Sequence, residues 1–307
     1  MAEITAAMVK ELRETTGAGM LDCKKALVEA NGNMDEAVDW LRKKGLASAA
    51  KKSSRIAAEG LVAVKVEGNQ GAVVEVNSET DFVAKNDIFQ TYVEDAATVA
   101  LATNGDVEAM KNHKDADGKT FGERLTDMIA RIGENMNLRR AKVVKVNNGL
   151  VCSYVHNVAR DGLGKIGVLV ALESAGDKAK LADLGKHIAM HIAATAPIAL
   201  NIAGVPSEAV EHEKSIFAEQ AAASGKPANI IEKMIEGRIR KFYEEVVLEE
   251  QAFIMDPDKK VKAVVADAAK DLGADIKLAD YAFFKLGDGL QKKEEDFAAE
   301  VNAQLKK

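Results

Sequence analysis

The spacing of the apolar residues changes early in the chain, and this change requires a fold that mixes helices with sheet. Across residues 5–45 the apolar side chains recur every three or four positions, which predicts three short helices. Val62, Val64 and Val66 then recur at every second position, and the turn at 68–71 leads into another apolar run. This pattern predicts a β-hairpin. A three-helix bundle of this size has a marginal core, so we expect it to be a module appended to a larger body.

The second half of the chain repeats the order of elements in the first half. A strand predicted at 166–172 precedes a helix at about 178–194, just as the strand at 72–76 precedes the helix at 87–102. The strings GAVVEV and GVLVAL begin the two strands and share a pattern with little identity. The sequence therefore predicts a diverged duplication and two related α+β subdomains.

The segments between these elements are interpreted from composition and turn residues. We expect a basic linker at 48–59, a polar and mobile loop at 103–119, a helix at 121–132 and an Asn-Gly hairpin over 141–156.

The last third of the chain predicts a helical hairpin and a return to the sheet. Two helical runs between 207 and 245 are joined by a turn at 224–227, which favours an antiparallel arm. The segments 261–272 and 276–286 return to the sheet of the second subdomain, and 290–305 predicts a final amphipathic helix.

The expected fold is therefore α+β with four parts. They are a helical bundle at 1–54, a first core subdomain at 55–148, a second at 149–287 with its hairpin insertion at about 197–250, and a C-terminal helical module at 288–307.

Composition narrows the class of protein. The chain is 47% hydrophobic and 29% charged with a net charge of −6, which is typical of a globular protein and argues against a dedicated nucleic-acid binder. Cys23 and Cys152 are far apart, so neither a disulfide framework nor a zinc site is predicted. No signal segment or membrane-spanning run is evident. We expect a cytoplasmic protein with no membrane partner.

One glycine pattern resembles a cofactor motif. Residues 162–167 match the G-x-G-x-x-G pattern of dinucleotide-binding folds, in which a strand leads into a helix. Here the glycines join two predicted strands, so a flexible connection is favoured and no cofactor is expected. An oxidoreductase that uses these glycines is kept as an alternative.

Two histidines have the spacing of zinc ligands. His187 and His191 would share a helix face, as in a His-Glu-x-x-His metalloprotease, but Ile188 replaces the glutamate. Packing within the helix is favoured over metal binding. His156, at the end of a predicted strand, is either a contact residue or a capped strand end.

The segment 80–87 carries an aromatic residue at a loop. Phe82 follows a predicted strand and is either a plug for the subdomain core or an exposed anchor for a partner protein. The residues alone leave both interpretations open.

Two long runs resemble the elongation factor Ts family. The first is LRETTGAGMLDCKKAL at 12–27, and the second is EVNSETDFVAK at 75–85. Shorter runs at 132–135, 186–191 and 236–238 are also similar to the family. The resemblance covers the whole chain.

The resemblance implies both a fold and an activity. It implies an N-terminal bundle of the ubiquitin-associated type, a core of two subdomains, a helical hairpin and a C-terminal module. It also implies that the partner is the GTPase elongation factor Tu, from which GDP is released so that GTP can bind, with no active site in this chain. A homodimer within a 2:2 complex is left open.

The resemblance further implies the residues that contact the GTPase. Phe82 and Asp81 match the residues that enter the G domain near its Mg²⁺ and phosphates, and Thr80 and Val83 flank them. The remaining matched contacts are Arg13, Met20 and Leu21 in the bundle, and Lys52, Ile132, Gly133 and His156 elsewhere.

The sequence also departs from the family in a few places. The segments 103–119 and 157–165 look longer than the common pattern, and Leu21 stands where Met is associated with the family.

Beside the exchange factor and the oxidoreductase, a third functional hypothesis is a scaffold built on the N-terminal bundle, which would bind partners other than the GTPase.

Overall fold

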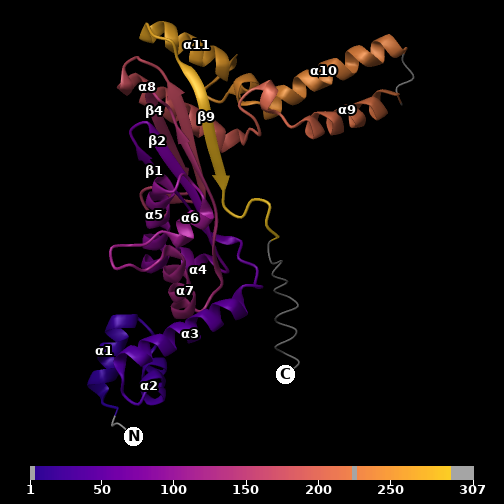
Figure 1. Ribbon diagram of the computed structural model, residues 1–307. Helices are drawn as coiled ribbons and strands as arrows, with labels where there is room; N and C mark the ends of the chain where they lie inside the picture. Colours follow the sequence, from indigo (N-terminus) through magenta and orange to yellow (C-terminus); the bar gives the residue numbers. More distant parts are fainter. Residues whose placement is uncertain (1–3, 223–226, 292–307) are drawn as a thin grey trace.

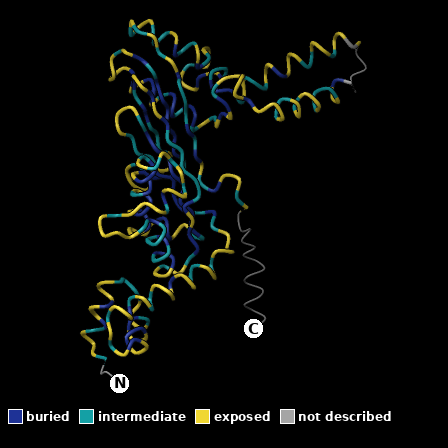
Figure 2. Tube along the Cα trace, viewed as in Figure 1, coloured by how far each residue is buried: buried dark blue, intermediate teal, exposed yellow. Residues whose placement is uncertain are grey.

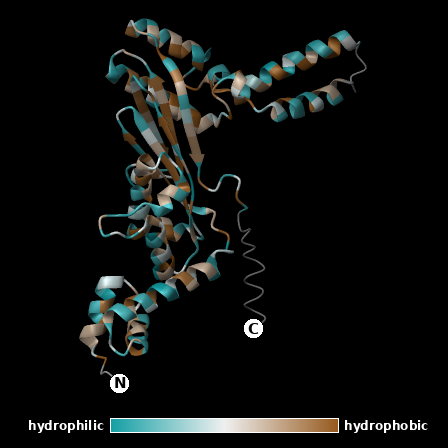
Figure 3. Cartoon of the chain, viewed as in Figure 1, coloured by the Kyte–Doolittle hydropathy of each residue, from teal (hydrophilic) through white to brown (hydrophobic). Residues whose placement is uncertain are grey.

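The computed structural model describes residues 4–222 and 227–291 of the chain. Figure 1 shows an elongated molecule with a helical bundle at one end, a central body of strands covered by helices, and a helical arm that leaves the body near the other end. Buried residues are concentrated along the strands of the body, whereas the arm is largely exposed (Figure 2). Apolar residues follow the same strands (Figure 3).

The predicted N-terminal bundle is confirmed, and side chains cap the starts of its first and third helices. Its helices are α1 (Ala6–Thr16), α2 (Met20–Glu29) and α3 (Met34–Lys52). The Thr5 side chain accepts a hydrogen bond from Met8 N in α1, and the Asn33 side chain accepts from two backbone N–H groups of α3. The bundle closes over a small core that includes Leu12, Cys23 and Leu27.

The predicted basic linker at 48–59 is wrong over its first part, because α3 continues to Lys52. The alanines in this stretch are strong helix formers. The second half of α3 also packs on the body, where Ala49 contacts the core and a Cβ atom built on Gly45 would lie 3.5 Å from Ala130 Cβ. The bundle is therefore joined to the body by a packed helix.

The first sheet has the strand order β3-β2-β1-β5. Its strands are β1 (Glu59–Glu67), β2 (Gln70–Ser78), β3 (Met136–Lys145) and β5 (Leu163–Gly164), all antiparallel to their neighbours. The predicted β1–β2 hairpin is confirmed. Its central strand β2 is buried from Gly71 to Ser78.

Four helices accompany this sheet. They are α4 (Asp81–Ala84), α5 (Asp87–Ala102), α6 (Val107–Asn112) and α7 (Phe121–Ile132). The expectation of a polar and mobile loop at 103–119 is wrong over part of its length, because this stretch contains α6 and its buried Met110. Met110 and the partly buried Val107 anchor this short helix on the core. Two apolar residues are too few to mark a helix by periodicity in the sequence.

The second sheet has the order β4-β6-β9. Its strands are β4 (Gly149–His156), β6 (Ile166–Glu173) and β9 (Lys277–Lys285). The predicted hairpin over 141–156 is therefore wrong, since β3 pairs with β2 and β4 pairs with β6. The Asn-Gly turn carries the chain from one sheet to the other around the β1–β2 turn, where Val146 N donates to Asn69 O and Val151 N to Gly68 O.

The two sheets pack face to face, and helices cover their outer faces. Alternate residues of β1 point in opposite directions: Leu61 lies in the core shared with α5 and α7, and Val62 lies between the sheets with Leu169. Gly71 and Gly167 permit the close approach, because an added Cβ would lie 2.8 Å from a Val151 atom and 2.7 Å from a Val62 atom, respectively.

The remaining elements build the second subdomain and the arm. They are α8 (Lys178–Thr195), η1 (Ile202–Gly204), α9 (Ser207–Ala222), α10 (Ala228–Val246), η2 (Leu248–Glu250), β7 (Ala252–Phe253), β8 (Asp256–Lys260) and α11 (Val261–Leu272). The two helices of the predicted hairpin are confirmed as α9 and α10, which form the projecting arm (Figure 1). Most of the turn predicted at 224–227, and the helix predicted at 290–305 beyond residue 291, lie outside the described residues.

A buried carboxylate joins the two sheets where the chain leaves β9. Glu75 on β2 accepts hydrogen bonds from Arg139 Nη1 at 2.9 Å, Arg140 Nε at 2.6 Å, Asn77 Nδ2 at 2.9 Å and Gly287 N at 2.8 Å. Burial alone would raise the pKa of Glu75, but these hydrogen bonds outweigh it and hold the pKa below its ordinary value. The residue is therefore an anion inside the protein.

We expect Glu75→Gln to destabilise the protein strongly. The substitution leaves two arginines without their carboxylate, and breaking a buried ion pair in this way costs about 3–5 kcal/mol. Urea unfolding followed by circular dichroism measures the change. The control is Glu67→Gln on the exposed end of β1, whose Lys65 contact is 3.7 Å long and for which we expect a change within about 0.5 kcal/mol. Equal effects of the two substitutions would contradict the role of Glu75.

Candidate partner-binding surface

The short helix α4 turns the side chain of Phe82 toward solvent. Val83 and Ala84 on the same turn are buried in the core of the first sheet, which fixes the orientation of the helix. Phe82 is 76% exposed, whereas Phe89 on the next helix is fully buried. Of the two interpretations left open by the sequence, the structure excludes the core plug and agrees with the exposed anchor.

A carboxylate from another loop holds the residue that precedes α4. Glu134 accepts hydrogen bonds from Thr80 N at 2.9 Å and from Thr80 Oγ1 at 2.7 Å. In return, Asn135 N donates to Glu79 Oε1 at 2.5 Å. Reciprocal hydrogen bonds thus join the loop after β2 to the loop after α7. These bonds fix the backbone at the start of α4.

Charged groups of α4 surround the exposed ring. Lys85 Nζ lies 5.8 Å from the centre of the Phe82 ring and 3.8 Å from Asp81 Oδ2. Both charged side chains are more than half exposed, so their ion pair contributes little to stability. The surface therefore presents an aromatic ring with one acid and one base beside it, which is typical of the anchors at protein interfaces.

The structure brings several of the predicted contact residues together in one place. We call Thr80, Asp81, Phe82, Ile132 and Gly133 the core group: Ile132 ends α7, and Gly133 adopts the left-handed conformation that leads into Glu134.

Two further predicted contacts end their elements, Lys52 at the end of α3 and His156 at the end of β4. Lys52 is the last residue of α3, and Arg55 just after it reaches Glu79 Oε1 at 3.4 Å. His156 is exposed at the end of β4, with Nδ1 3.1 Å from the Tyr154 hydroxyl.

The other predicted contacts lie on the bundle, apart from the core group. Met20 and Leu21 begin α2 and are 61% and 83% exposed, and Arg13 on α1 is exposed as well. Figure 1 shows α1 and α2 at the end of α3 that is away from the body. We call these three residues the bundle group. Val83 differs from both groups, because its side chain is buried and supports α4 from inside.

Sequence reasoning missed the residues that position the core group. Glu134, Glu79 and Asn135 act through hydrogen bonds between segments more than 50 residues apart. The sequence signals for them were the family-like runs at 75–85, which contains Glu79, and at 132–135, which contains Glu134 and Asn135. Neither run indicates that these side chains bond to each other's loops. The pairing of Thr80 with Glu134 depends on the packing of α7 against the sheet, which no local pattern encodes.

The glycines of the cofactor-like motif serve to pack the two sheets. Gly164 lies on β5 and Gly167 on β6, and no helix follows either glycine directly. A Cβ at Gly164 would lie 2.5 Å from a Val155 atom and 2.7 Å from His156 O. The strand-to-helix turn that a pyrophosphate requires is thus replaced by a crowded contact between strands.

The two histidines on α8 do not form a zinc site. His191 is fully buried, its Nε2 lies 2.9 Å from Gln251 Oε1, and its Nδ1 accepts a hydrogen bond from Ile254 N at 3.3 Å. His187 instead lies 3.5 Å from Asp183 on the exposed side. Within residues 4–222 and 227–291, no group of three or more His, Cys, Asp or Glu side chains is placed to hold a metal ion.

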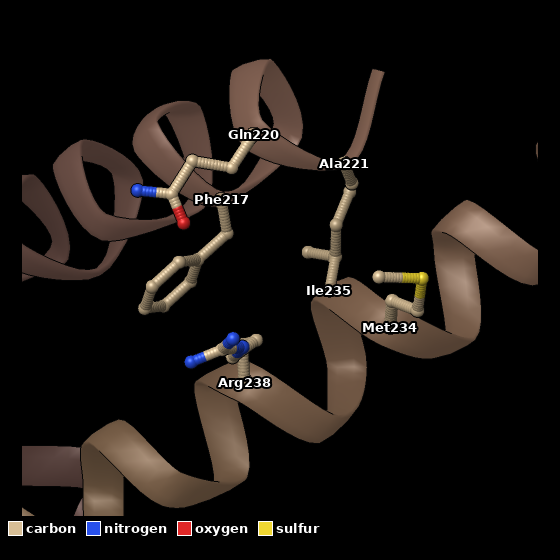
Figure 4. Close-up of a pocket in the computed structure, with 6 residues that line it drawn as sticks. All are labelled: Phe217, Gln220, Ala221, Met234, Ile235 and Arg238. Atoms are coloured by element: carbon tan, nitrogen blue, oxygen red, sulfur yellow. The ribbon is translucent and has the colours of Figure 1, made fainter. Parts of the chain in front are cut away.

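The arm contains a small pocket between its helices. It has a volume of about 100 Å³ and is lined by Phe217, Gln220 and Ala221 of α9 and by Met234, Ile235 and Arg238 of α10 (Figure 4). The Arg238 guanidinium lies 5.9 Å from the Phe217 ring. Sites for small molecules are usually several times larger, so this pocket is a packing gap between two helices. None of the described helices is long and apolar enough to cross a membrane.

Comparison with known proteins gives one consistent result. The family model described as elongation factor TS matches residues 79–288. The chain is 58% identical over 309 residues to the elongation factor Ts of Rhodospirillum rubrum, and 58% identical over 307 residues to that of Rhizobium etli, with 100% of each chain covered in both cases. It is 57% identical to the elongation factor Ts of Maricaulis maris, with 99% of this chain and 98% of the relative covered.

We expect His191 to make stability depend on pH. Burial lowers the pKa of His191 and outweighs the bond to Gln251, which raises it. The unfolded chain therefore binds a proton at this residue before the folded protein does, and stability falls as the pH drops below about 6.5. His191→Gln should flatten the dependence of unfolding free energy on pH between 7 and 5, measured by urea unfolding. His187→Gln is the control and should leave the wild-type slope; an unchanged slope in His191→Gln would contradict the assignment.

Proposed function

The chain belongs to the elongation factor Ts family of translation elongation factors, and we propose that it is a guanine-nucleotide exchange factor. Its partner is elongation factor Tu in the GDP-bound state, from which it promotes GDP release so that GTP can bind. The observation that carries this proposal is the exposed Phe82 ring on a helix whose other side is anchored in the core.

The support beneath Phe82 suits insertion into a partner. Fully burying a Phe side chain is worth about 1.5–3 kcal/mol. Ordering a loop at an interface would consume part of this gain, but α4 is already fixed by buried Val83 and by the Glu134 bonds to Thr80. Most of the gain is therefore left for displacing contacts within the GTPase.

The reaction is a linkage between two ligands of the GTPase. The exchange factor binds the nucleotide-free form more tightly than the GDP form, so each ligand weakens the other by the same factor. Phe82 and Asp81 would occupy space near the Mg²⁺ and phosphates of the partner, and the lost contacts would be offset by contacts elsewhere. No covalent bond is made or broken, and this chain needs no active site of its own.

The distance between the two groups of contact residues explains the long chain. The core group would press on the nucleotide site while the bundle group holds the same G domain from α1 and α2. Because α3 is packed on the body through Gly45 and Ala49, the two groups keep a fixed separation. A rigid connection lets binding at one group assist binding at the other.

The direct test is release of a fluorescent GDP analogue from elongation factor Tu, followed by stopped flow with and without this protein. We expect release to accelerate with increasing protein and then to saturate. An unchanged release rate at every concentration would overturn the proposal. Calorimetry with GDP and with NAD gives a second test, because micromolar binding of either to this chain alone would support the enzyme alternative.

We expect Phe82→Ala to slow stimulated GDP release by about tenfold or more, since a loss of 1.4 kcal/mol in differential binding does so. Its free energy of unfolding should stay within about 0.5 kcal/mol of wild type, because the side chain is exposed. Phe89→Ala is the matched control and should lose about 3–5 kcal/mol of stability, because its ring is buried. Asp81→Ala should slow release less than Phe82→Ala. A stable and fully active Phe82→Ala protein would remove Phe82 from the site.

We expect Leu21→Ala to weaken binding to nucleotide-free elongation factor Tu by about fivefold to thirtyfold without changing stability. The side chain is 83% exposed at the start of α2, and burying it against a partner would contribute about 1–2 kcal/mol. Leu27→Ala on the same helix is the stability control, since Leu27 is fully buried and should lose about 2–5 kcal/mol. Unchanged affinity in Leu21→Ala, measured by titration calorimetry, would remove Leu21 from the bundle group.

A further inference from the structure

A turn next to the core group carries an exposed apolar side chain. Residues 157–162 connect β4 to β5, and Val158 is 62% exposed. Asn157 adopts the left-handed conformation with φ of 52°, which directs the chain outward immediately after His156. We call residues 157–162 the Val158 turn.

The base of the Val158 turn is held by backbone hydrogen bonds. Ala159 N donates to Leu163 O at 2.9 Å, Leu163 N donates to Arg160 O at 2.9 Å, and Lys165 N donates to His156 O at 3.1 Å. Leu163 is buried in the same core as Val83, so the turn and α4 rest on one packed unit. The Val158 side chain is thus presented from a fixed base.

An ion pair holds the turn against the start of α5. Arg160 Nη2 lies 3.4 Å from Asp87 Oδ1, and Asp87 is the first residue of α5, three positions after α4 ends. Both side chains are well exposed, so the pair contributes little to the stability of the fold. Its effect is on where the turn lies.

A single exposed valine is ordinary on a protein surface, so the exposure of Val158 alone indicates no function. Its position in the fold is the informative feature. The turn begins at His156, a proposed contact residue, and reaches through Arg160 to the helix that follows Phe82. Ile88, next to Asp87, is exposed as well. Three exposed apolar side chains, Phe82, Ile88 and Val158, thus lie on α4, on the start of α5 and on the turn that Arg160 pairs with that start.

We propose that the Val158 turn is a further contact on elongation factor Tu. This inference rests on the proposed exchange function. Val158 packs on the G domain beside the place that Phe82 enters, and Arg160 is a positioning residue that acts through the turn. The occupant of this surface is the same GTPase, because the turn and the core group rest on the same core.

The first test measures binding of Val158 variants to nucleotide-free elongation factor Tu by titration calorimetry. Val158→Asp should raise the dissociation constant at least fivefold with an unchanged melting temperature, and Val158→Leu should bind like wild type. Ile254→Asp is the matched control, an exposed aliphatic residue on the turn between β7 and β8. Wild-type affinity in Val158→Asp, or an equal loss in Ile254→Asp, would overturn the proposal.

The second test separates positioning from simple stabilisation. Arg160→Ala should weaken binding about twofold to fivefold, and Arg160→Lys, which can still pair with Asp87, should recover most of the loss. In a Val158→Ala background, Arg160→Ala should have little further effect, because Arg160 acts through Val158. Fully additive losses in this double-mutant cycle would overturn the positioning role.

The outcomes distinguish this inference from the function on which it rests. If the wild-type protein fails to accelerate release of the GDP analogue, the exchange function itself falls. If the wild type is active and Phe82→Ala is impaired while Val158→Asp matches wild type, only the role of the Val158 turn is overturned.

Discussion

The arrangement of the body depends on one buried carboxylate. Glu75 lies on the central strand β2 and binds two arginines of β3 and the backbone of Gly287, which follows the last strand of the other sheet. Burying a charge is costly unless its partners are complete, and here four donors converge on one side chain. The Arg140 guanidinium also stacks over the Phe284 ring at 4.3 Å. The relation between the two sheets is thus set by a specific polar contact as well as by apolar packing.

The position of the candidate site also depends on β2, because this strand leads into α4. β2 ends at Ser78, and α4 begins three residues later at Asp81, with its N-cap residue Thr80 held by Glu134. The buried strand β2, the loop that Glu134 holds at Thr80, and the helix α4 form one continuous support. Phe82 therefore has a defined place relative to the sheet. The proposed exchange function needs such rigidity, because a side chain that yields on contact would displace nothing in the partner.

Elements with strong local patterns could be predicted from the sequence, and pairings between distant segments could not. The spacing of apolar residues located α5 at its observed ends, Asp87 and Ala102. The Asn-Gly signal at 147–149 correctly marked a turn, but a turn does not determine which strands pair, and β3 and β4 entered different sheets. The repeated order of strand and helix was visible in the sequence as a pattern. The reason for the glycines in its strands, the close approach of the two sheets at Gly71 and Gly167, became apparent only with the second sheet in place.

Prediction from the sequence was limited in the same way at the candidate site, where the role of one side chain was in question. An aromatic after a strand is equally suited to a core and to an interface, so residue type could not decide the role of Phe82. Its direction follows from the burial of Val83 and Ala84, which depends on how β2, α5 and α7 pack. The run 75–85 therefore holds two linked features, the carboxylate that joins the sheets and the ring offered to a partner, only seven positions apart. Because both rest on β2, we expect a change that loosens Glu75 to act on the position of Phe82 as well, which would couple stability to the proposed exchange activity through one strand.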